Sequence, residues 1–135
     1  MRIDEYDTHS FAFATDIENA PDTLENRYEI TYDLSDFEKE MMYDDQYDYW
    51  EIYKSEDKYI GFAYHTKSSY QNIRYNTENS KINNITIEGR DYLFYVSPTG
   101  VNCLTWDNGD CIMEFFYKDI SIENALQIIS SIIKL

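Results

Sequence analysis

Glycine and proline are unusually scarce in this sequence, which has four glycines and two prolines among 135 residues. Phosphate-binding loops and the oxyanion loops of many hydrolases need several glycines close together, because the backbone itself must approach the ligand. The scarcity of glycine therefore excludes the usual nucleotide-binding loops. Turns must instead be formed largely by Asn, Asp and Ser, whose short side chains bond to the nearby backbone.

Cysteine and histidine are equally rare, with two residues of each type: Cys103, Cys111, His9 and His65. A structural zinc site needs four ligands, which ordinarily occur as closely spaced pairs. No such spacing is present, so we expect no metal site, and no motif indicates another cofactor. Two cysteines are compatible with a reduced protein or with a single disulfide.

Basic residues are few: 11 Lys and Arg stand against 26 Asp and Glu, which gives a formal net charge of −15 and a sequence pI near 4.2. Proteins that bind nucleic acids by neutralising phosphates need a basic patch, and anionic lipids also attract basic segments. This composition excludes a nucleic-acid partner of that kind and argues against docking on anionic lipid. Long apolar runs are missing too, so we expect neither a transmembrane helix nor a signal peptide within this chain.

Apolar and aromatic residues are plentiful, at 43% and 17% of the chain. A chain of this length can bury roughly two-thirds of its unfolded surface in one core. We therefore expect one α+β domain over residues 25–135, preceded by an N-terminal arm over residues 1–24 that contains a possible first strand at Ser10–Ala14.

Alternation of apolar and polar residues predicts a series of strands. Residues 33–40 read as a turn or a short helical piece with Ser35 as a possible cap, and residues 66–80 read as a loop that can include one helical turn. The predicted strands are Tyr28–Tyr32, Tyr47–Lys54, Tyr59–His65, Ile82–Glu88, Tyr92–Val96, Val101–Trp106 and Cys111–Lys118.

The dipeptide Asn108-Gly109 between two apolar runs is a strong hairpin signal. If these two residues form the loop, Cys111 pairs with Trp106 and Cys103 pairs with Glu114. The two cysteines then lie on opposite faces of the hairpin, which favours free thiols over a disulfide. The more apolar face, which we expect to meet the core, carries Leu104, Trp106, Cys111, Met113 and Phe115.

The C-terminal segment is predicted to be an amphipathic helix. Ser121 is suited to its N-cap, Glu123 to its first turn and Lys134 to its last turn. Together with the strands, this predicts an α+β fold: a twisted antiparallel sheet of about six to eight strands with a C-terminal helix packed on one face. The alternative is that the apolar stripe of this helix packs against a partner helix in a coiled coil. The apolar stripe consists of Ile122, Ala125, Leu126, Ile129, Ile132 and Ile133.

No group of residues points to catalysis. Acidic pairs such as Asp44-Asp45 are expected by chance among 26 acids. His65 lies near Ser68 and Ser69, but the strand–turn–helix elbow and the glycine-rich oxyanion loop of a hydrolase are missing. We therefore predict a protein that is not an enzyme, with no catalytic, cofactor-binding or metal-binding residues.

Charge and tyrosine are concentrated in the first 60 residues, which hold 18 acidic and 5 basic residues. Tyrosines alternate with carboxylates there, a pattern that suits an interaction surface for a basic partner. A solvated sheet face that keeps an aromatic strand soluble is the simpler interpretation of the same pattern. The candidate residues, which we call the acidic tyrosine surface, are Tyr43, Asp44, Asp45, Tyr47, Asp48, Tyr49, Glu51 and Tyr53.

Several short motifs follow one another in a fixed order along the chain. They are Thr86-Ile87-Glu88-Gly89, the aromatic residues Tyr92, Phe94 and Tyr95, Leu104-Thr105-Trp106 with Asn108-Gly109, and Ile120-Ser121 leading into Ala125, Ile128, Ile129, Ser131 and Ile132. The earlier segments Tyr28–Tyr32, Tyr59–Phe62 and Thr66–Tyr70 fit the same pattern. In this order the motifs resemble the domain of unknown function 4367 family of bacteria, over roughly residues 25–134.

This resemblance implies an extracytoplasmic domain of a Gram-positive membrane protein, of which some resemble anti-sigma factors. The expected function is a non-catalytic sensor or recognition domain of a membrane-anchored regulator, with an unknown protein or peptide as ligand. Anchoring requires a membrane segment that this chain lacks. The alternative is a free-standing acidic inhibitor or decoy that binds a basic partner. The strand Phe115–Lys118 is bulkier than the family pattern suggests, and the oligomeric state is left open.

Overall fold

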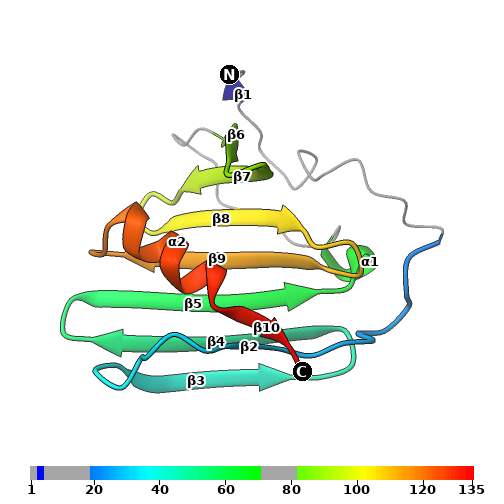
Figure 1. Cartoon of the computed structure of the whole chain (residues 1–135), viewed down its shortest axis with the longest axis horizontal. Helices are drawn as coiled ribbons and strands as arrows, with labels where there is room; N and C mark the ends of the chain where they lie inside the picture. Colours follow the sequence, from blue (N-terminus) through cyan, green and yellow to red (C-terminus); the bar gives the residue numbers. More distant parts are fainter. Residues whose placement is uncertain (1–2, 5–18, 71–81) are drawn as a thin grey trace.

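The computed structural model describes residues 3–4, 19–70 and 82–135, and the predicted strand at Ser10–Ala14 lies outside these residues. Its main feature is an eight-stranded antiparallel sheet with the order β1-β6-β7-β8-β9-β5-β4-β3 (Figure 1). The predicted fold class is therefore confirmed. The strands are β1 (Ile3–Asp4), β3 (Glu38–Asp44), β4 (Asp48–Ser55), β5 (Lys58–His65), β6 (Ile82–Ile87), β7 (Arg90–Val96), β8 (Asn102–Asp107) and β9 (Ile112–Lys118).

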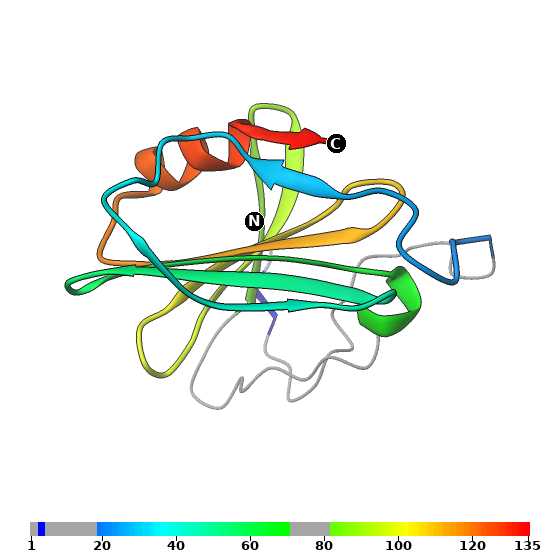
Figure 2. The same ribbon diagram turned by 90° about the horizontal axis from the view of Figure 1, so that it is seen from below.

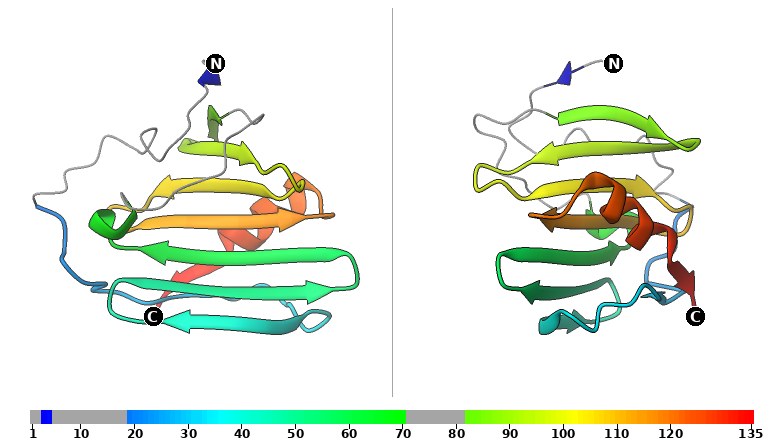
Figure 3. Two further views of the ribbon diagram at one scale, coloured as in Figure 1. Left: turned by 180° about the vertical axis from the view of Figure 1, so that it is seen from behind. Right: turned by 60° about the vertical axis from the view of Figure 1, so that its left-hand side comes forward.

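A second layer covers one face of this sheet. It consists of helix α2 (Ile122–Ser130) and a two-stranded antiparallel ribbon formed by β2 (Tyr28–Ile30) and β10 (Ile132–Lys134). Figure 2 shows this layer lying above the sheet. We call the covered side the helix face and the other side, seen in the left view of Figure 3, the distal face. A short helix, α1 (Lys67–Tyr70), follows the end of β5.

The main core lies between these two layers. Because successive residues of a strand point to opposite faces, alternate residues of β5, β8 and β9 meet α2. Ala125, Ile128 and Ile129 are the fully buried residues of α2. A smaller buried cluster on the other side contains Ile82, Leu93, Tyr95 and Cys103. The main core consists of Ile60, Phe62, Tyr64, Tyr92, Leu104, Trp106, Cys111, Met113, Phe115, Tyr117 and the three α2 residues.

The β8–β9 hairpin has a different register from the predicted one. Trp106 pairs with Met113, not with Cys111, and Cys103 pairs with Phe116, not with Glu114. The reason is a longer loop, in which Asn108 N–H donates to the Cys111 carbonyl. A shift of two residues preserves the alternation of faces. Both cysteines are free, as predicted, and both are buried; the predicted core face is confirmed.

The C-terminal helix is shorter than predicted. Ser121 caps its N-terminus, since its Oγ accepts a hydrogen bond from Asn124 N–H. The helix ends at Ser130, however, and Lys134 belongs to β10 instead of a last helical turn. Ser131 bonds back to the Ile128 carbonyl through both its hydroxyl and its N–H, and the β-branched residues that follow pair with β2. Of the predicted stripe, Ile122 and Ile133 are exposed.

Two other segments differ from the sequence prediction or refine it. Residues 38–44 form the edge strand β3, where the sequence suggested only the end of a turn. The turn before it is closed by Ser35 N–H, which donates to the Asp33 carboxylate, so Ser35 does not cap a helix. The helical turn expected within residues 66–80 is found as α1. In the described parts of the chain, no helix combines the length and apolarity that crossing a membrane requires.

Candidate functional site

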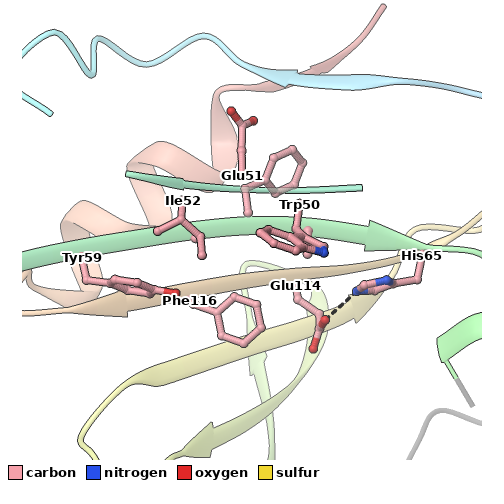
Figure 4. Close-up of a pocket in the computed structure, with 10 residues that line it drawn as sticks. Trp50, Glu51, Ile52, Tyr59, His65, Glu114 and Phe116 are labelled. Atoms are coloured by element: carbon pink, nitrogen blue, oxygen red, sulfur yellow. Dashed lines mark hydrogen bonds and ion pairs between the residues drawn. The ribbon is translucent and has the colours of Figure 1, made fainter. Parts of the chain in front are cut away.

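Strand β4 sends alternate side chains into two different cavities. Trp50 and Ile52 point to the distal face, whereas Tyr49, Glu51 and Tyr53 point to the helix face, as the opposed directions of Trp50 and Glu51 show (Figure 4). This division follows from the two-residue period of an extended strand. The two faces of one strand therefore have different chemistry.

The cavity on the distal face is mainly apolar and has a volume of about 350 Å³. Gly61 and Ala63 of β5 lie between the larger side chains of β4 and β9, so the distal face of the sheet is recessed at this point. A Cβ at Gly61 would lie 3.2 Å from Phe116 Cδ2. We call this cavity the apolar hollow; it is lined by Trp50, Glu51, Ile52, Tyr59, Gly61, Phe62, Ala63, His65, Glu114 and Phe116.

One end of the apolar hollow is polar. His65 Nδ1 lies 2.8 Å from Asp48 Oδ1. His65 Nε2 lies 2.8 Å from Glu114 Oε1, a contact that Figure 4 shows. Ser69 of α1 donates from Oγ to the same Asp48 oxygen at 2.6 Å. His65 and Glu114 are 6% and 2% exposed. The network therefore joins β4, β5, β9 and α1, with His65 and Glu114 buried and the Asp48 side chain 27% exposed.

The protonation of His65 follows from these contacts. Burial alone would lower its pKa, but the hydrogen bonds to Asp48 and Glu114 and the charges of these carboxylates outweigh burial and raise the pKa to about 9. The hydrogen bond from His65 in turn lowers the pKa of Asp48. His65 is therefore an imidazolium at neutral pH, and both of its N–H groups donate to carboxylates.

This network is not arranged as a serine–histidine–aspartate triad. In a triad the serine hydroxyl bonds to the histidine nitrogen that is not held by the carboxylate. Here Ser69 bonds to Asp48, and Glu114 occupies the second nitrogen of His65. The network can orient side chains and place negative charge at the end of the hollow. It offers no neutral ring nitrogen that could take a proton from Ser69.

The cavity on the helix face is polar and measures about 340 Å³. Glu51 is 5% exposed, accepts a hydrogen bond from the Tyr53 hydroxyl and lies 3.4 Å from Lys39 Nζ. Burial, followed by the nearby Glu51 carboxylate, raises the pKa of Tyr49 and of Tyr53. We call this the tyrosine cavity; it is lined by Arg27, Tyr28, Glu29, Ile30, Lys39, Asp44, Tyr49, Glu51, Tyr53, Tyr64 and Leu135.

The residues of the acidic tyrosine surface do not form one continuous surface. Four of them, Asp44, Tyr49, Glu51 and Tyr53, line the tyrosine cavity. On the distal face Tyr43 stacks on Trp50 at 5.6 Å, and Asp48 belongs to the His65 network. The two others lie at the β3–β4 turn: Asp45 accepts hydrogen bonds from the N–H groups of Tyr47 and Asp48, and Tyr47 is exposed.

Sequence reasoning missed the apolar hollow. Its essential feature is the pair Gly61 and Ala63, two small residues on the same face of a strand. Their spacing was visible in the sequence, and it indicates a low point on a sheet face. Glu114 was not identified because it comes from β9, 49 positions from His65. In residues 3–4, 19–70 and 82–135, no group of histidine, cysteine and acidic side chains is placed to hold a metal ion.

The comparisons with known proteins give one match. The model of the family described as Domain of unknown function (DUF4367) matches residues 27–132. This range contains both cavities of β4 except for Leu135 and includes every residue of the His65 network. No curated protein and no solved structure matches the chain.

Proposed function

This chain belongs to the DUF4367 family, and we propose that it is a non-catalytic recognition domain of an extracytoplasmic, membrane-anchored regulator that resembles an anti-sigma factor. Its ligand is a protein or peptide segment that presents an apolar side chain close to a cationic group. The apolar hollow is the observation that carries this proposal.

The apolar part of the ligand is argued from the lining of the hollow. Trp50, Ile52 and Phe116 form walls around a low surface at Gly61 and Ala63. The volume of about 350 Å³ is in the range of small-ligand sites. Transfer of one leucine-sized side chain from water into such a site contributes about 1.5–3 kcal/mol.

The cationic part is argued from charge complementarity. Two carboxylates, Asp48 and Glu114, share the single positive charge of His65 at the polar end. Trp50, Tyr59 and Phe116 add aromatic rings, which attract cations through their electron-rich faces. The chain as a whole carries a formal charge of −15, so it attracts cationic partners from a distance.

The non-catalytic character is supported by the hydrogen bonds that the polar residues of the site form. His65, the one histidine among the described residues that line the hollow, donates from both nitrogens. Ser69 is bonded to Asp48. A general base needs a free lone pair within reach of the proton that it removes, and His65 lacks one in this arrangement.

The extracytoplasmic location is supported by the resemblance to the family. It is tested by the coding sequence upstream of residue 1 in the source genome. A hydrophobic span of about 20 residues there supports membrane anchoring. An open reading frame that begins at Met1 contradicts it.

The ligand class is tested by panning a phage-displayed peptide library on the immobilised protein. We expect enrichment of peptides in which Lys or Arg stands next to Leu, Ile, Met or an aromatic residue. The variants Gly61→Val and Ala63→Val place bulk in the hollow and should each abolish this enrichment. Asn84→Val places the same side chain at an exposed position of β6 and should leave it unchanged.

Thermal unfolding of each variant separates loss of binding from loss of folding. Enrichment of the same peptides on folded Ala63→Val and on the wild type contradicts the proposal. Absence of any enrichment on the wild type contradicts it as well.

A second candidate function is the free-standing acidic inhibitor or decoy. It is favoured by β3, an edge strand on which all seven residues are exposed, including Glu38, Glu40 and Asp44. Binding to a basic protein through exposed charges weakens steeply as salt is added, whereas binding in an apolar hollow persists. Recovery of a basic protein at low salt only, with affinity unchanged in Ala63→Val, favours this second candidate.

A further inference from the structure

A third cavity lies between the sheet and the second layer, apart from both cavities of β4. Its volume is about 70 Å³. A single water needs only about 10–15 Å³ of such space, so there is room for a few waters or one small ion. We call it the basic cavity; it is lined by Tyr28, Arg90, Trp106, Asn108, Met113, Ile129, Ile132 and Lys134.

Trp106 contributes a buried donor without an acceptor. Its side chain is 1% exposed, and its Nε1–H has no hydrogen-bond partner among the described residues. Leaving a buried donor unpaired costs about 1–3 kcal/mol, so such groups in folded proteins normally have a partner. The cavity that borders the same ring is the space in which an acceptor can sit.

Two cations, both of them exposed to solvent, border the same cavity. Arg90 holds its guanidinium 5.2 Å from the centre of a Trp106 ring, and Lys134 comes from β10 on the opposite layer. Within the described segments neither forms an ion pair with a carboxylate. Lys58 and Lys118 also lack such a pair, so half of the eight Lys and Arg residues in these segments have none. By contrast, Arg27, Lys39, Lys54 and Lys67 all lie within 4 Å of a carboxylate oxygen.

The remaining polar groups of the wall have their partners elsewhere. Asn108 Nδ2 donates to the Tyr28 hydroxyl and to Asp110, and the Tyr28 hydroxyl donates to Asp110. Asp110 also accepts from Asn26 and is not one of the lining residues. The wall therefore presents an unused N–H donor and two cations that lack a carboxylate partner, with no carboxylate among its lining residues.

We infer that the basic cavity binds a small oxyanion of carboxylate or sulfate size, which accepts a hydrogen bond from Trp106 Nε1–H and lies between Arg90 and Lys134. Charge-assisted hydrogen bonds are the stronger kind, and an anion here satisfies the buried donor and both cations at once. Because Arg90 belongs to the sheet and Lys134 to the ribbon, the bound anion also links the two layers.

The inference is tested by following the two indole N–H signals in ¹H–¹⁵N NMR spectra during titration with acetate, sulfate and phosphate. Trp50→Phe assigns the signals, and ionic strength is held constant with sodium chloride. We expect the Trp106 signal to shift saturably, with a dissociation constant of about 1 mM, while the Trp50 signal stays in place. Arg90→Gln and Lys134→Gln should each weaken binding about tenfold.

Lys58→Gln is the matched control, since it removes one exposed positive charge outside the cavity. It should leave the titration unchanged. A cavity that holds only water gives no saturable shift of the Trp106 signal and overturns the inference. An equal shift in the double variant Arg90→Gln/Lys134→Gln also overturns it, provided that the thermal unfolding midpoint shows this variant to be folded.

Discussion

His65 joins segments that are far apart in the sequence through its two ring nitrogens. Asp48 precedes it by 17 positions and Glu114 follows it by 49. A buried charge is costly unless it is paired and hydrogen-bonded, and here each N–H has its own carboxylate. The imidazolium is therefore a structural element of the hollow, and its loss should lower the free energy of unfolding.

The first prediction concerns the pH dependence of unfolding. The folded-state pKa of His65 is raised to about 9 from 6.5. Its contribution to stability is fully present below pH 6.5 and is lost as the pH rises through 9. The shift corresponds to about 3 kcal/mol. Urea unfolding at a series of pH values should show a decline across this range that is absent in His65→Gln.

His65→Gln is the reference for the wild type, because the variant retains all the other titrating groups. If the wild type and the variant lose stability in parallel between neutral pH and pH 10, the imidazolium pair does not contribute as described.

Part of this network was visible in the sequence and part was not. The closeness of His65, Ser68 and Ser69 could be read directly, because a strand end followed by a helical turn keeps them together. The pairing with Glu114 could not be read, because it depends on β9 lying next to β5 in the sheet. Strand order across a sheet is set by the whole fold and not by local sequence.

At the scale of elements, the strands that pack into the core were predicted correctly and β3 was missed. Strand β5 is buried from Ile60 to His65 and β4 is at least half-buried along most of its length, so both carry the apolar and aromatic residues that identify a strand. All seven residues of β3 are exposed, so nothing selects an alternating pattern. Its bulge between Lys39 and Met41 and its charged residues are features that protect an edge strand from pairing with other chains.

Helix α2 allows a prediction about capping. Ser121 Oγ accepts a hydrogen bond from Asn124 N–H at 3.0 Å. Ser121→Ala should lower the free energy of unfolding by about 1 kcal/mol, because one donor of the first turn loses its partner. Ser35→Ala, at an exposed turn outside any helix, is the control and should change stability by less than about 0.5 kcal/mol. Equal effects of the two substitutions would argue against Ser121 as a cap.

At the scale of the whole molecule, the net charge and the two-layer fold depend on different features of the sequence. The layers follow from the apolar faces of the strands and of α2, which the sequence patterns largely predicted. The pairing of β2 with β10 was not predicted, because Ile132 and Ile30 are 102 positions apart. In addition, Ile132 and Ile133 continue the apolar spacing of the helix, so the sequence gives no sign that a strand begins there. The net charge of −15 plays no part in choosing this fold.

The charge does predict the effect of salt on stability. Self-repulsion among 26 acids and 11 bases destabilises the compact state, and salt screens it. Addition of sodium chloride from about 0.01 M to 0.15 M, which shortens the screening length from about 30 to 8 Å, should raise Tm by a few degrees. A fall in Tm over this range means that stabilising ion pairs outweigh the repulsion.

The central claim, that the apolar hollow receives an apolar group next to a positive charge, is tested most directly by three probes of equal chain length. The Trp50 indole N–H signal is followed by NMR during titration with hexylammonium, hexanol and hexanoate. We predict a saturable shift that is largest with hexylammonium, weaker with hexanol, absent with hexanoate and lost in Ala63→Val. A response to hexanoate as large as that to hexylammonium, or an unchanged response in folded Ala63→Val, contradicts the account.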